Sequence, residues 1–398
     1  MRAPMIVALL QLTACGHPSG PSNLEVDLDA SLDVAAALAG SGSTEGFARA
    51  EKAREFSFPS DHGAHSGFRT EWWYVTGNLT AGDGRAFGYQ LTFFRNALAP
   101  VTAPATSPPA GASHWRTDHV WMAHLAISDE RGRRFRFAER FAREALDLAG
   151  AKDGLDVRLR DWRLVGSDPG FPARLVAEEA TAGGGMALDL QLDSARPPVL
   201  QGEAGLSRKG TEPGNASYYY SMTRLDTRGA LTLDGERFEV SGLSWLDREW
   251  STSALGPELV GWDWFALQLD DGRDLMFYRL RRRDGSSDSQ SAGSIVAPDG
   301  TTSTLSRADV SLEPLSFFES TDGATRYPAR WRLRVSSEDL DVILTPRVAD
   351  QELRVTVRYW EGAVEVKGTS RGQPLTGHGF VEMTGYAAAP ALGRAAAP

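Results

Sequence analysis

Apolar and polar residues alternate along short segments through most of this chain, which is the period of a half-buried β-strand. Asp-Gly and Gly-Gly pairs, which favour tight turns, separate the segments. The clearest alternating runs are Leu231–Val240, Trp331–Val335, Val342–Leu344 and Leu353–Tyr359. No segment has a long apolar repeat of helical period, and the best helix candidate is the short stretch Ala138–Leu148. The pattern therefore predicts an all-β protein.

Two segments share one plan and predict a repeated hairpin. Glu71–Arg95 and Gly261–Leu280 each contain an aromatic strand, an Asp-Gly-Arg turn and a return strand with Tyr-x-Leu. Glycine suits such a turn because it adopts positive φ without steric cost. We expect equivalent hairpins in two antiparallel β-barrel domains, because closure into a barrel removes exposed strand edges. The expected domains are residues 53–242 and 243–386.

The first residues predict export. Arg2 precedes the apolar run Met5–Leu12, and Cys15, the single cysteine of the chain, follows Leu-Thr-Ala. These are features of a secretory signal, and the run is too short to span a bilayer. The context of Cys15 resembles a bacterial lipobox. We expect residues 1–14 to be a signal peptide and a lipidated Cys15 to anchor the protein to a membrane of the bacterial envelope, in the periplasm or at the cell surface.

The segments next to the domains have a different composition. Residues 15–52 are rich in Gly, Ser, Ala and Asp, which is typical of a flexible tether. Residues 387–398 are rich in Ala and Pro and predict a disordered tail.

Composition excludes some partners and bonds. The net charge is −10, with basic residues interleaved among acidic ones, which argues against nucleic acid as a partner because phosphate binding needs a basic patch. Membrane attachment must therefore come from the lipid. With one cysteine, no intramolecular disulfide can form. The chain has eleven tryptophans, in clusters, which indicate a large core or a cavity for an apolar ligand.

Several motifs, in order along the chain, resemble the AttH/CrtC-like lipocalin family. They are Asp61–His65, Phe68–Tyr74, Gly88–Arg95, Trp121–His124, Trp245–Trp250, Gly261–Phe265, Tyr359–Val364 and Gly379–Tyr386. The resemblance implies two tandem lipocalin-like antiparallel β-barrel domains. We expect no cofactor. Relatives in this family include carotenoid 1,2-hydratases and some fungal cyclisation enzymes, and bacterial members are often labelled secreted hydrolases.

Hydratase chemistry sets physical demands on a site. A carboxylic acid protonates an alkene and water captures the cation, so the acid needs a raised pKa in a buried apolar site, where aromatic faces stabilise the cation. The His-x-Trp pair of the hydratases is matched here by Trp250 alone, because Arg248 stands in place of the histidine. Their Tyr-x-Asp is not matched at Tyr278. The candidate proton donors are therefore Asp247, Glu249 and Asp263.

Aromatic residues near these acids are the candidate ligand-binding residues: Trp73, Tyr74, Trp250, Trp262 and Trp264. A short connection after Trp250 favours neighbouring strands, so carboxylates and rings could converge on one cavity. Alternate residues of a strand face opposite sides, so Trp72 and Trp73 cannot both line it. In the alternative interpretation, the three acids form structural charge pairs with arginines such as Arg248 or Arg279.

The other motifs carry little chemistry. The histidines His62, His65, His114, His119 and His124 form no tight ligand set, so no metal site is predicted, and His124 is better interpreted as a buried, hydrogen-bonded histidine. The chain has no Gly-x-Ser-x-Gly elbow, no Walker loop and no Gly-x-Gly-x-x-Gly fingerprint. A serine hydrolase, an NTPase and a Rossmann oxidoreductase are not supported.

Three functions remain open. The protein binds a small apolar molecule as a carrier, transforms it as a hydratase or hydrolase, or serves as an envelope scaffold with solid barrels. A continuous cavity would exclude the scaffold, and a buried carboxyl group facing that cavity would favour the enzyme. The sequence specifies neither the ligand nor the oligomeric state.

Overall fold

The computed structural model describes residues 44–100, 117–180, 184–194, 196–252, 255–256 and 258–387. All of them belong to the compact unit Ser31–Pro398. Cys15, the expected signal peptide and nearly all of the expected tail lie outside the described residues. Two antiparallel sheets contain most of this part of the chain, and its helical segments are the short 3-10 turns Ser60–His62 and Ser336–Glu338. The prediction of an all-β protein is confirmed.

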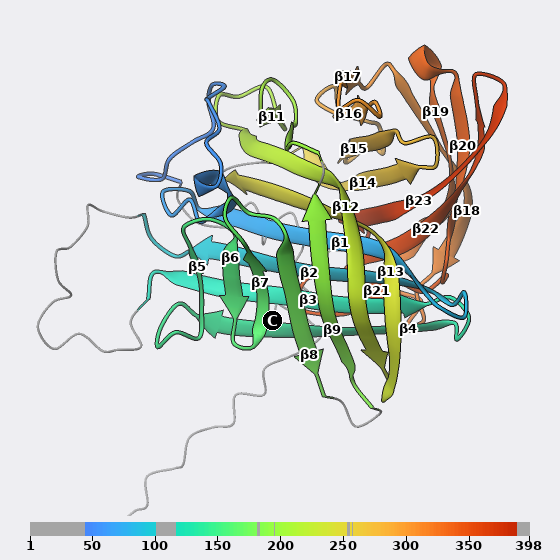
Figure 1. The fold of residues 1–398 in the computed structure, drawn as a ribbon. Coiled ribbons are helices and arrows are strands. Elements are labelled where there is room, and N and C mark those ends of the chain that lie inside the picture. Colours follow the sequence, from blue (N-terminus) through green and yellow to red (C-terminus); the bar gives the residue numbers. More distant parts are fainter. Residues whose placement is uncertain are drawn as a thin grey trace, which may run out of the picture. The chain divides into compact units, whose positions relative to one another are not determined.

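The first sheet contains the strands of the N-terminal half, which Figure 1 shows from blue to yellow-green. Their bounds are β1 (Thr70–Ala81), β2 (Ala86–Ala97), β3 (His119–Asp129), β4 (Arg134–Arg143), β5 (Ala149–Lys152), β6 (Asp156–Leu159), β7 (Trp162–Gly166), β8 (Ala173–Glu179), β9 (Met186–Ser194), β10 (Val199–Leu200), β11 (Leu206–Arg208), β12 (Ala216–Leu233) and β13 (Glu236–Ser251). They lie in the order β4-β3-β2-β1-β13-β12-β9-β8-β7-β6-β5, and the short β10 and β11 pair with β12.

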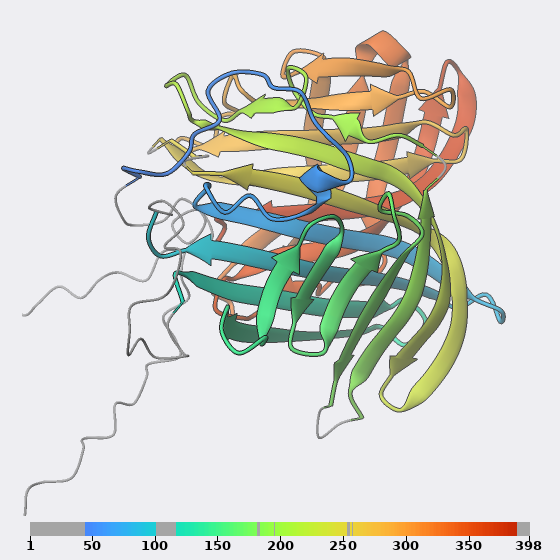
Figure 2. The same ribbon diagram turned by 60° about the vertical axis from the view of Figure 1, so that its left-hand side comes forward.

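The second sheet contains the remaining strands and lies in the order β17-β16-β15-β14-β23-β22-β20-β19-β18, with β21 paired to β22. Their bounds are β14 (Leu259–Leu269), β15 (Asp274–Arg282), β16 (Ala292–Val296), β17 (Thr302–Ser306), β18 (Val310–Glu319), β19 (Arg326–Val335), β20 (Leu340–Pro346), β21 (Glu352–Leu353), β22 (Tyr359–Ser370) and β23 (Gln373–Thr384). Figure 2 shows the strands of both sheets curving, most strongly in β12 and β13. Each sheet forms a barrel or half-barrel.

The two expected hairpins are confirmed. Strands β1 and β2 pair in the first sheet, and β14 and β15 pair in the second. The turn glycines Gly84 and Gly272 have φ of 79° and 88°, in the left-handed region that glycine adopts without strain. The repeated sequence plan therefore corresponds to one hairpin in each sheet.

Two details of the expected organisation need correction. The boundary expected between residues 242 and 243 falls inside β13, and the second sheet begins only at β14. The helix candidate Ala138–Leu148 is wrong, because β4 runs to Arg143 and pairs with β3, with Ala138 opposite Leu125. Its weak helical spacing is overridden by backbone pairing with a neighbouring strand.

Alternation along the strands gives each sheet a core of its own and a second buried face. One face of β1 contributes Trp73 and Val75 to the core of the first sheet, and one face of β14 contributes Phe265 and Leu267 to that of the second. The opposite faces meet in a third apolar cluster, which contains Tyr74, Trp245, Trp264 and Tyr278, among others. Both faces of the central strands are therefore buried, and the third cluster lies between the two sheets.

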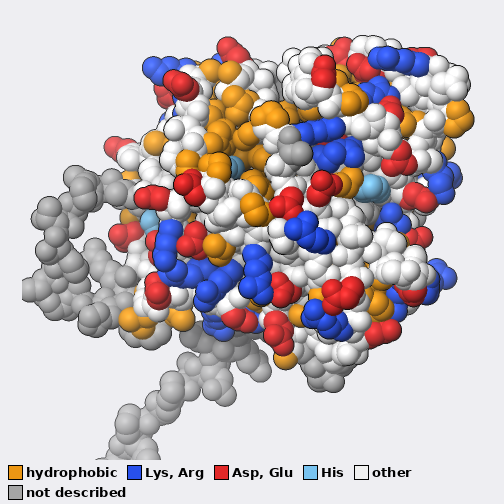
Figure 3. Space-filling model, in the orientation of Figure 1, with side chains coloured by type: hydrophobic (Ala, Val, Ile, Leu, Met, Phe, Trp, Pro, Cys, Tyr) orange, Lys and Arg blue, Asp and Glu red, His pale blue; other side chains and the backbone are white. Residues whose placement is uncertain are grey.

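The surface agrees with the interleaved charges of the sequence. Figure 3 shows acidic and basic side chains mixed across one face of the molecule. Within the described ranges, no helix is long and apolar enough to cross a membrane.

Candidate functional site

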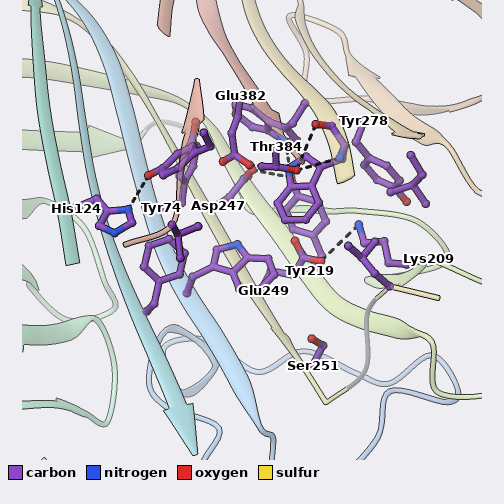
Figure 4. A pocket seen from close by; sticks show the side chains of 18 of the residues that line it. Tyr74, His124, Lys209, Tyr219, Asp247, Glu249, Ser251, Tyr278, Glu382 and Thr384 are labelled. Atoms are coloured by element: carbon purple, nitrogen blue, oxygen red, sulfur yellow. Dashed lines mark hydrogen bonds and ion pairs between the residues drawn. The ribbon is translucent and has the colours of Figure 1, made fainter. Parts of the chain in front are cut away.

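A pocket lies between the two sheets, on the faces that point away from their separate cores. It has a volume of about 110 Å³. Its walls are largely aromatic and come from both sheets; they include Trp72, Tyr74, Phe94, Tyr219, Trp262, Trp264, Tyr278 and Tyr359. Asp247, Glu249, Glu382 and Lys209 bring charge into this apolar setting (Figure 4).

Strand register brings the polar residues of the first wall together. Asp247 on β13 lies opposite Tyr74 on β1 and opposite Ser221 on β12. Two residues further along β13, Glu249 lies opposite Tyr219. Because side chains two residues apart share a face, Asp247 and Glu249 both point into the pocket.

Asp247 is a buried carboxyl group held by neutral donors. The Tyr219 hydroxyl donates to Oδ2 at 2.6 Å, while the Ser221 hydroxyl and Trp245 Nε1 donate to Oδ1 at 2.5 and 2.7 Å. Burial raises the pKa of Asp247 to about 7, and the charge of Glu249 adds to this, while the hydrogen bonds act in the opposite direction. The group can therefore give or take a proton near neutral pH.

Glu249 has a different environment, because a cation lies beside it. Lys209 Nζ lies 3.4 Å from its Oε1 (Figure 4). The Ser217 hydroxyl donates to the same oxygen. Lys209 also lies 3.7 Å from the centre of the Tyr278 ring. Burial alone would lower the pKa of Lys209, but Glu249 and Tyr278 outweigh it and the pKa is raised. Glu249 and Lys209 thus form a buried ion pair at the pocket wall.

The second sheet supplies a pair of acids that the sequence analysis did not select. Glu361 on β22 lies directly opposite Glu382 on β23. The Tyr74 hydroxyl donates to Glu361 Oε1 at 2.5 Å, and Trp262 Nε1 donates to Glu382 Oε1 at 2.5 Å. Burial raises the pKa of Glu382 to about 7 and that of Glu361 well above its usual range. An acid inside an apolar strand run, as in Phe380–Met383, was the available signal.

His124 lies at the pocket wall and is hydrogen-bonded through both ring nitrogens. Its Nδ1 lies 2.8 Å from the Tyr359 hydroxyl, and its Nε2 lies 3.0 Å from Glu139 Oε1. The Tyr359 hydroxyl also accepts a hydrogen bond from Gln90 Nε2 at 2.9 Å. The imidazole is fully buried, which confirms the expectation of a buried, hydrogen-bonded histidine.

Comparison with known proteins agrees with this architecture. The family model described as AttH-like matches residues 49–386. The chain belongs to the AttH-like family. The crystal structure of a Nitrosomonas europaea protein assigned as AttH is 35% identical, with a TM-score of 0.73; the match covers 85% of this chain and all of that one (100%). The prediction of two lipocalin-like β-barrel domains is thereby confirmed.

A second solved structure shares the fold at lower identity. Kievitone hydratase from Nectria haematococca is 18% identical to this AttH-like chain, with a TM-score of 0.62 and coverage of 86% and 98% of the two chains. None of the curated proteins matches the chain.

Asp263 requires a correction, because in this AttH-like chain it does not line the pocket. It lies on β14 between Trp262 and Trp264, so alternation turns it to the opposite face, and it is fully buried. Its Oδ2 forms an ion pair of 2.6 Å with Arg279, and its Oδ1 accepts from the Tyr386 hydroxyl at 2.8 Å. Asp263 is therefore a structural charge partner.

Two expected ligand-binding residues are also placed elsewhere, for the same reason. Trp73 stacks on Trp121 in the core of the first sheet, under the Arg248 guanidinium at 3.9 Å. Trp250 stacks on His65, with 3.7 Å between ring centres. Of the five expected aromatic residues, those that line the pocket are Tyr74, Trp262 and Trp264.

The histidines near the N-terminus of the first sheet belong to a buried polar network. His62 Nδ1 lies 2.5 Å from the Tyr220 hydroxyl, and burial lowers the pKa of His62 to about 4. His65 lies 3.0 Å from Asp61 and 3.2 Å from Glu71. Among the described residues, no group of three or more His, Cys, Asp or Glu side chains is arranged to hold a metal ion.

Proposed function

We propose that this AttH-like protein is an exported, lipid-anchored enzyme that transfers protons to a small, largely apolar molecule with a double bond, in a reaction of the hydratase type. The observation that carries the proposal is Asp247, a carboxyl group with neutral hydrogen-bond donors in an aromatic pocket. Its pKa of about 7 suits a proton donor at neutral pH, because the acid form is populated and the proton is still readily given.

The aromatic walls support the same chemistry. Protonation of an alkene creates a carbocation, which the π face of a neighbouring ring stabilises by about 1–2 kcal/mol in a dry site. Tyr74 lies opposite Asp247 across the strand pair, and the Trp264 indole donates to Tyr219, which itself donates to Asp247. The proton donor and the rings are therefore held in one network.

The size of the cavity limits the ligand. Sites for drug-sized molecules occupy about 300–1,000 Å³, so a volume of about 110 Å³ suits a small molecule or the reactive end of a longer one. A protein of the same fold is named kievitone hydratase. That name supports the reaction class, and the substrate of this chain stays open.

A non-catalytic carrier is the second candidate, favoured by the largely aromatic pocket wall. A carrier for an apolar ligand has no need of a buried, protonatable carboxyl group, and burial of such a group costs stability.

Export and lipid anchoring rest on the lipobox-like context of Cys15.

The test begins with native mass spectrometry of the protein from its host, to find a bound molecule. The pure protein is then incubated with small branched alkenes, and with longer apolar molecules that end in such an alkene, in heavy-oxygen water. We expect wild type to incorporate the labelled oxygen into one or more of them, and Asp247→Asn to lower kcat by about 10²–10⁴-fold, the usual contribution of a positioned acid.

Glu239→Gln is the matched control. Glu239 lies on the same strand and its side chain is 76% exposed, so this variant loses the same charge outside the pocket. Circular dichroism shows that each variant is folded. Binding without any product would favour the carrier, and equal turnover by Asp247→Asn would exclude Asp247 as the donor.

A further inference from the structure

The side chains of Glu361 and Glu382 lie next to each other on neighbouring strands. They are directly opposite in the register of β22 and β23, and each carboxyl group shifts the pKa of the other: Glu382 raises that of Glu361, and Glu361 lowers that of Glu382. The Tyr74 hydroxyl donates a hydrogen bond to Glu361 Oε1. The other oxygen, Oε2, is buried and has no hydrogen-bond partner among the described residues. A proton on Oε2 would give this atom a hydrogen bond to donate toward Glu382, its neighbour across the strand pair. Two ionised carboxyl groups side by side in a buried site would instead repel each other.

Lys209, which lines the same pocket as Glu382, is paired with Glu249. In the part of the chain that the structure describes, neither Glu361 nor Glu382 forms an ion pair. The titratable groups that act on them are themselves acidic: Tyr74 from β1, Tyr359 from β22, and Asp247 and Glu249 from β13. Ionisation of both carboxyl groups would place two negative charges in contact in a dry site, which opposes the loss of the second proton.

The proton belongs on Glu361. Glu361 is 1% exposed, whereas Glu382 reaches the pocket and accepts a hydrogen bond from Trp262 Nε1. A donor that points at Glu382 stabilises its ionised form, and the hydroxyl of a protonated Glu361 supplies a second one. The raised pKa of Glu361 agrees with this assignment.

We propose that Glu382 is the proton acceptor of the pocket, that Glu361 holds it ionised by donating its own proton in a hydrogen bond, and that Asp247 is the opposing acid. The proposal rests on the proposed function and adds the second half of its chemistry. Glu382 is a catalytic residue in this scheme, since it lines the pocket, and Glu361 is a positioning residue.

The addition of water then balances. Asp247 gives its proton to one alkene carbon, the π bond breaks, and a cation remains on the other carbon. Water forms a C–O bond to that cation as Glu382 takes one of its protons. The product is the alcohol, Asp247 is left ionised and Glu382 protonated, and the proton returns from Glu382 to Asp247 through solvent. Glu361 keeps its proton throughout.

The charge state is tested without any substrate. Infrared spectra of protein with carbon-13 in the glutamate carboxyl groups, recorded between about pH 5 and 9, separate protonated from ionised glutamate. We expect one protonated glutamate band that persists at neutral pH and is lost in Glu361→Gln, and one titrating group that is lost in Glu382→Gln. Spectra in which both glutamates are ionised at neutral pH would overturn the proposal.

The catalytic role is tested with an alkene that wild type hydrates. We expect Glu382→Gln to lower kcat by about 10²–10⁴-fold and to remove the acidic limb of the pH–rate profile, while Asp247→Asn removes the alkaline limb. Glu361→Gln keeps a donor toward Glu382 and should retain activity within a few fold. Glu361→Met, which keeps volume but no donor, should move the acidic limb to higher pH.

Glu365→Gln is the control, because Glu365 lies on β22 but is 44% exposed and paired with Lys367 at 2.7 Å. Wild-type turnover with an unchanged rate and pH profile in Glu382→Gln would overturn this proposal and leave the proposed function standing. A wild type that hydrates no alkene would remove the proposed function and the role of Glu382 with it, and the infrared bands would still decide whether the pair shares a proton.

Discussion

The hydroxyl group of Tyr74, in the first sheet, donates a 2.5 Å hydrogen bond to Glu361, in the second sheet. Both side chains are buried, with 5% and 1% of their surface exposed. The bond joins the wall that contains Asp247 to the wall that contains the glutamate pair. The candidate site therefore exists only where the two sheets pack together, and neither barrel contains it alone.

Tyr74→Phe should destabilise the protein without unfolding it. The change removes the hydroxyl that donates to Glu361 Oε1 and leaves this buried oxygen without that hydrogen bond. Such a loss lowers the free energy of unfolding by about 1–3 kcal/mol. Urea unfolding followed by tryptophan fluorescence gives the difference. Tyr218→Phe is a milder comparison, because that hydroxyl donates to the Lys52 carbonyl at 2.9 Å near the surface. Equal stability of Tyr74→Phe and wild type would show that the bond adds nothing.

Asp247 should make stability depend on pH in a defined direction. Its pKa is about 4 in an unfolded chain and about 7 in the folded one. The folded state therefore holds the proton more tightly than the unfolded chain does, and this tighter binding stabilises the fold. The stabilisation is fully present below about pH 4 and is lost as pH rises through about 7.

Asp247→Asn removes that contribution. The stability of wild type relative to Asp247→Asn should fall between about pH 4 and 7, by a few kcal/mol at most. Urea midpoints at half-unit steps of pH measure it. The pH-dependent contributions of other acids to stability, such as that of Glu71, are the same in both proteins and cancel in the difference. A difference that is constant with pH would show that the pKa of Asp247 is unperturbed.

Asp263→Asn should affect stability and leave binding in the pocket intact. It leaves Arg279 and Arg281, whose side chains are 16% and 10% exposed, without their buried carboxylate partner. Breaking a buried pair costs about 3–5 kcal/mol. Thermal unfolding measures the loss, and binding of the ligand found by mass spectrometry is measured below the melting temperature. Weaker binding at unchanged stability would assign Asp263 to the site instead.

Cys15→Ser should release the protein from the membrane fraction. The lipobox-like segment before Cys15 predicts lipid on that residue, and several acyl chains anchor a protein almost permanently, at about 0.8 kcal/mol for each buried methylene. Cell fractionation and the mass of the mature protein check it. An intact mature protein without acyl mass on Cys15 would refute the anchor, and the fold of Cys15→Ser should be unchanged.

Residues far apart in sequence form the candidate site, and the sequence indicated only part of it. Asp247 and Glu249 were selected because they lie between tryptophans near the join of the domains. Glu361 and Glu382 were not selected, because nothing in their strands shows that they meet Tyr74. Asp263 could have been excluded from the pocket by the alternation of side chains along a strand, because it lies between Trp262 and Trp264 and so faces the opposite side.

The sequence by itself determined the strands, the two hairpins and the family, because alternation and turn glycines act over a few residues. It also determined which neighbours share a face, such as Asp247 and Glu249. It could not determine which face is the pocket, because both faces of β1 and β14 are apolar and buried, so polarity no longer separates inside from outside. Only the packing of one sheet on the other decided that Tyr74 meets Glu361 while Trp73 stays in the core of its own barrel.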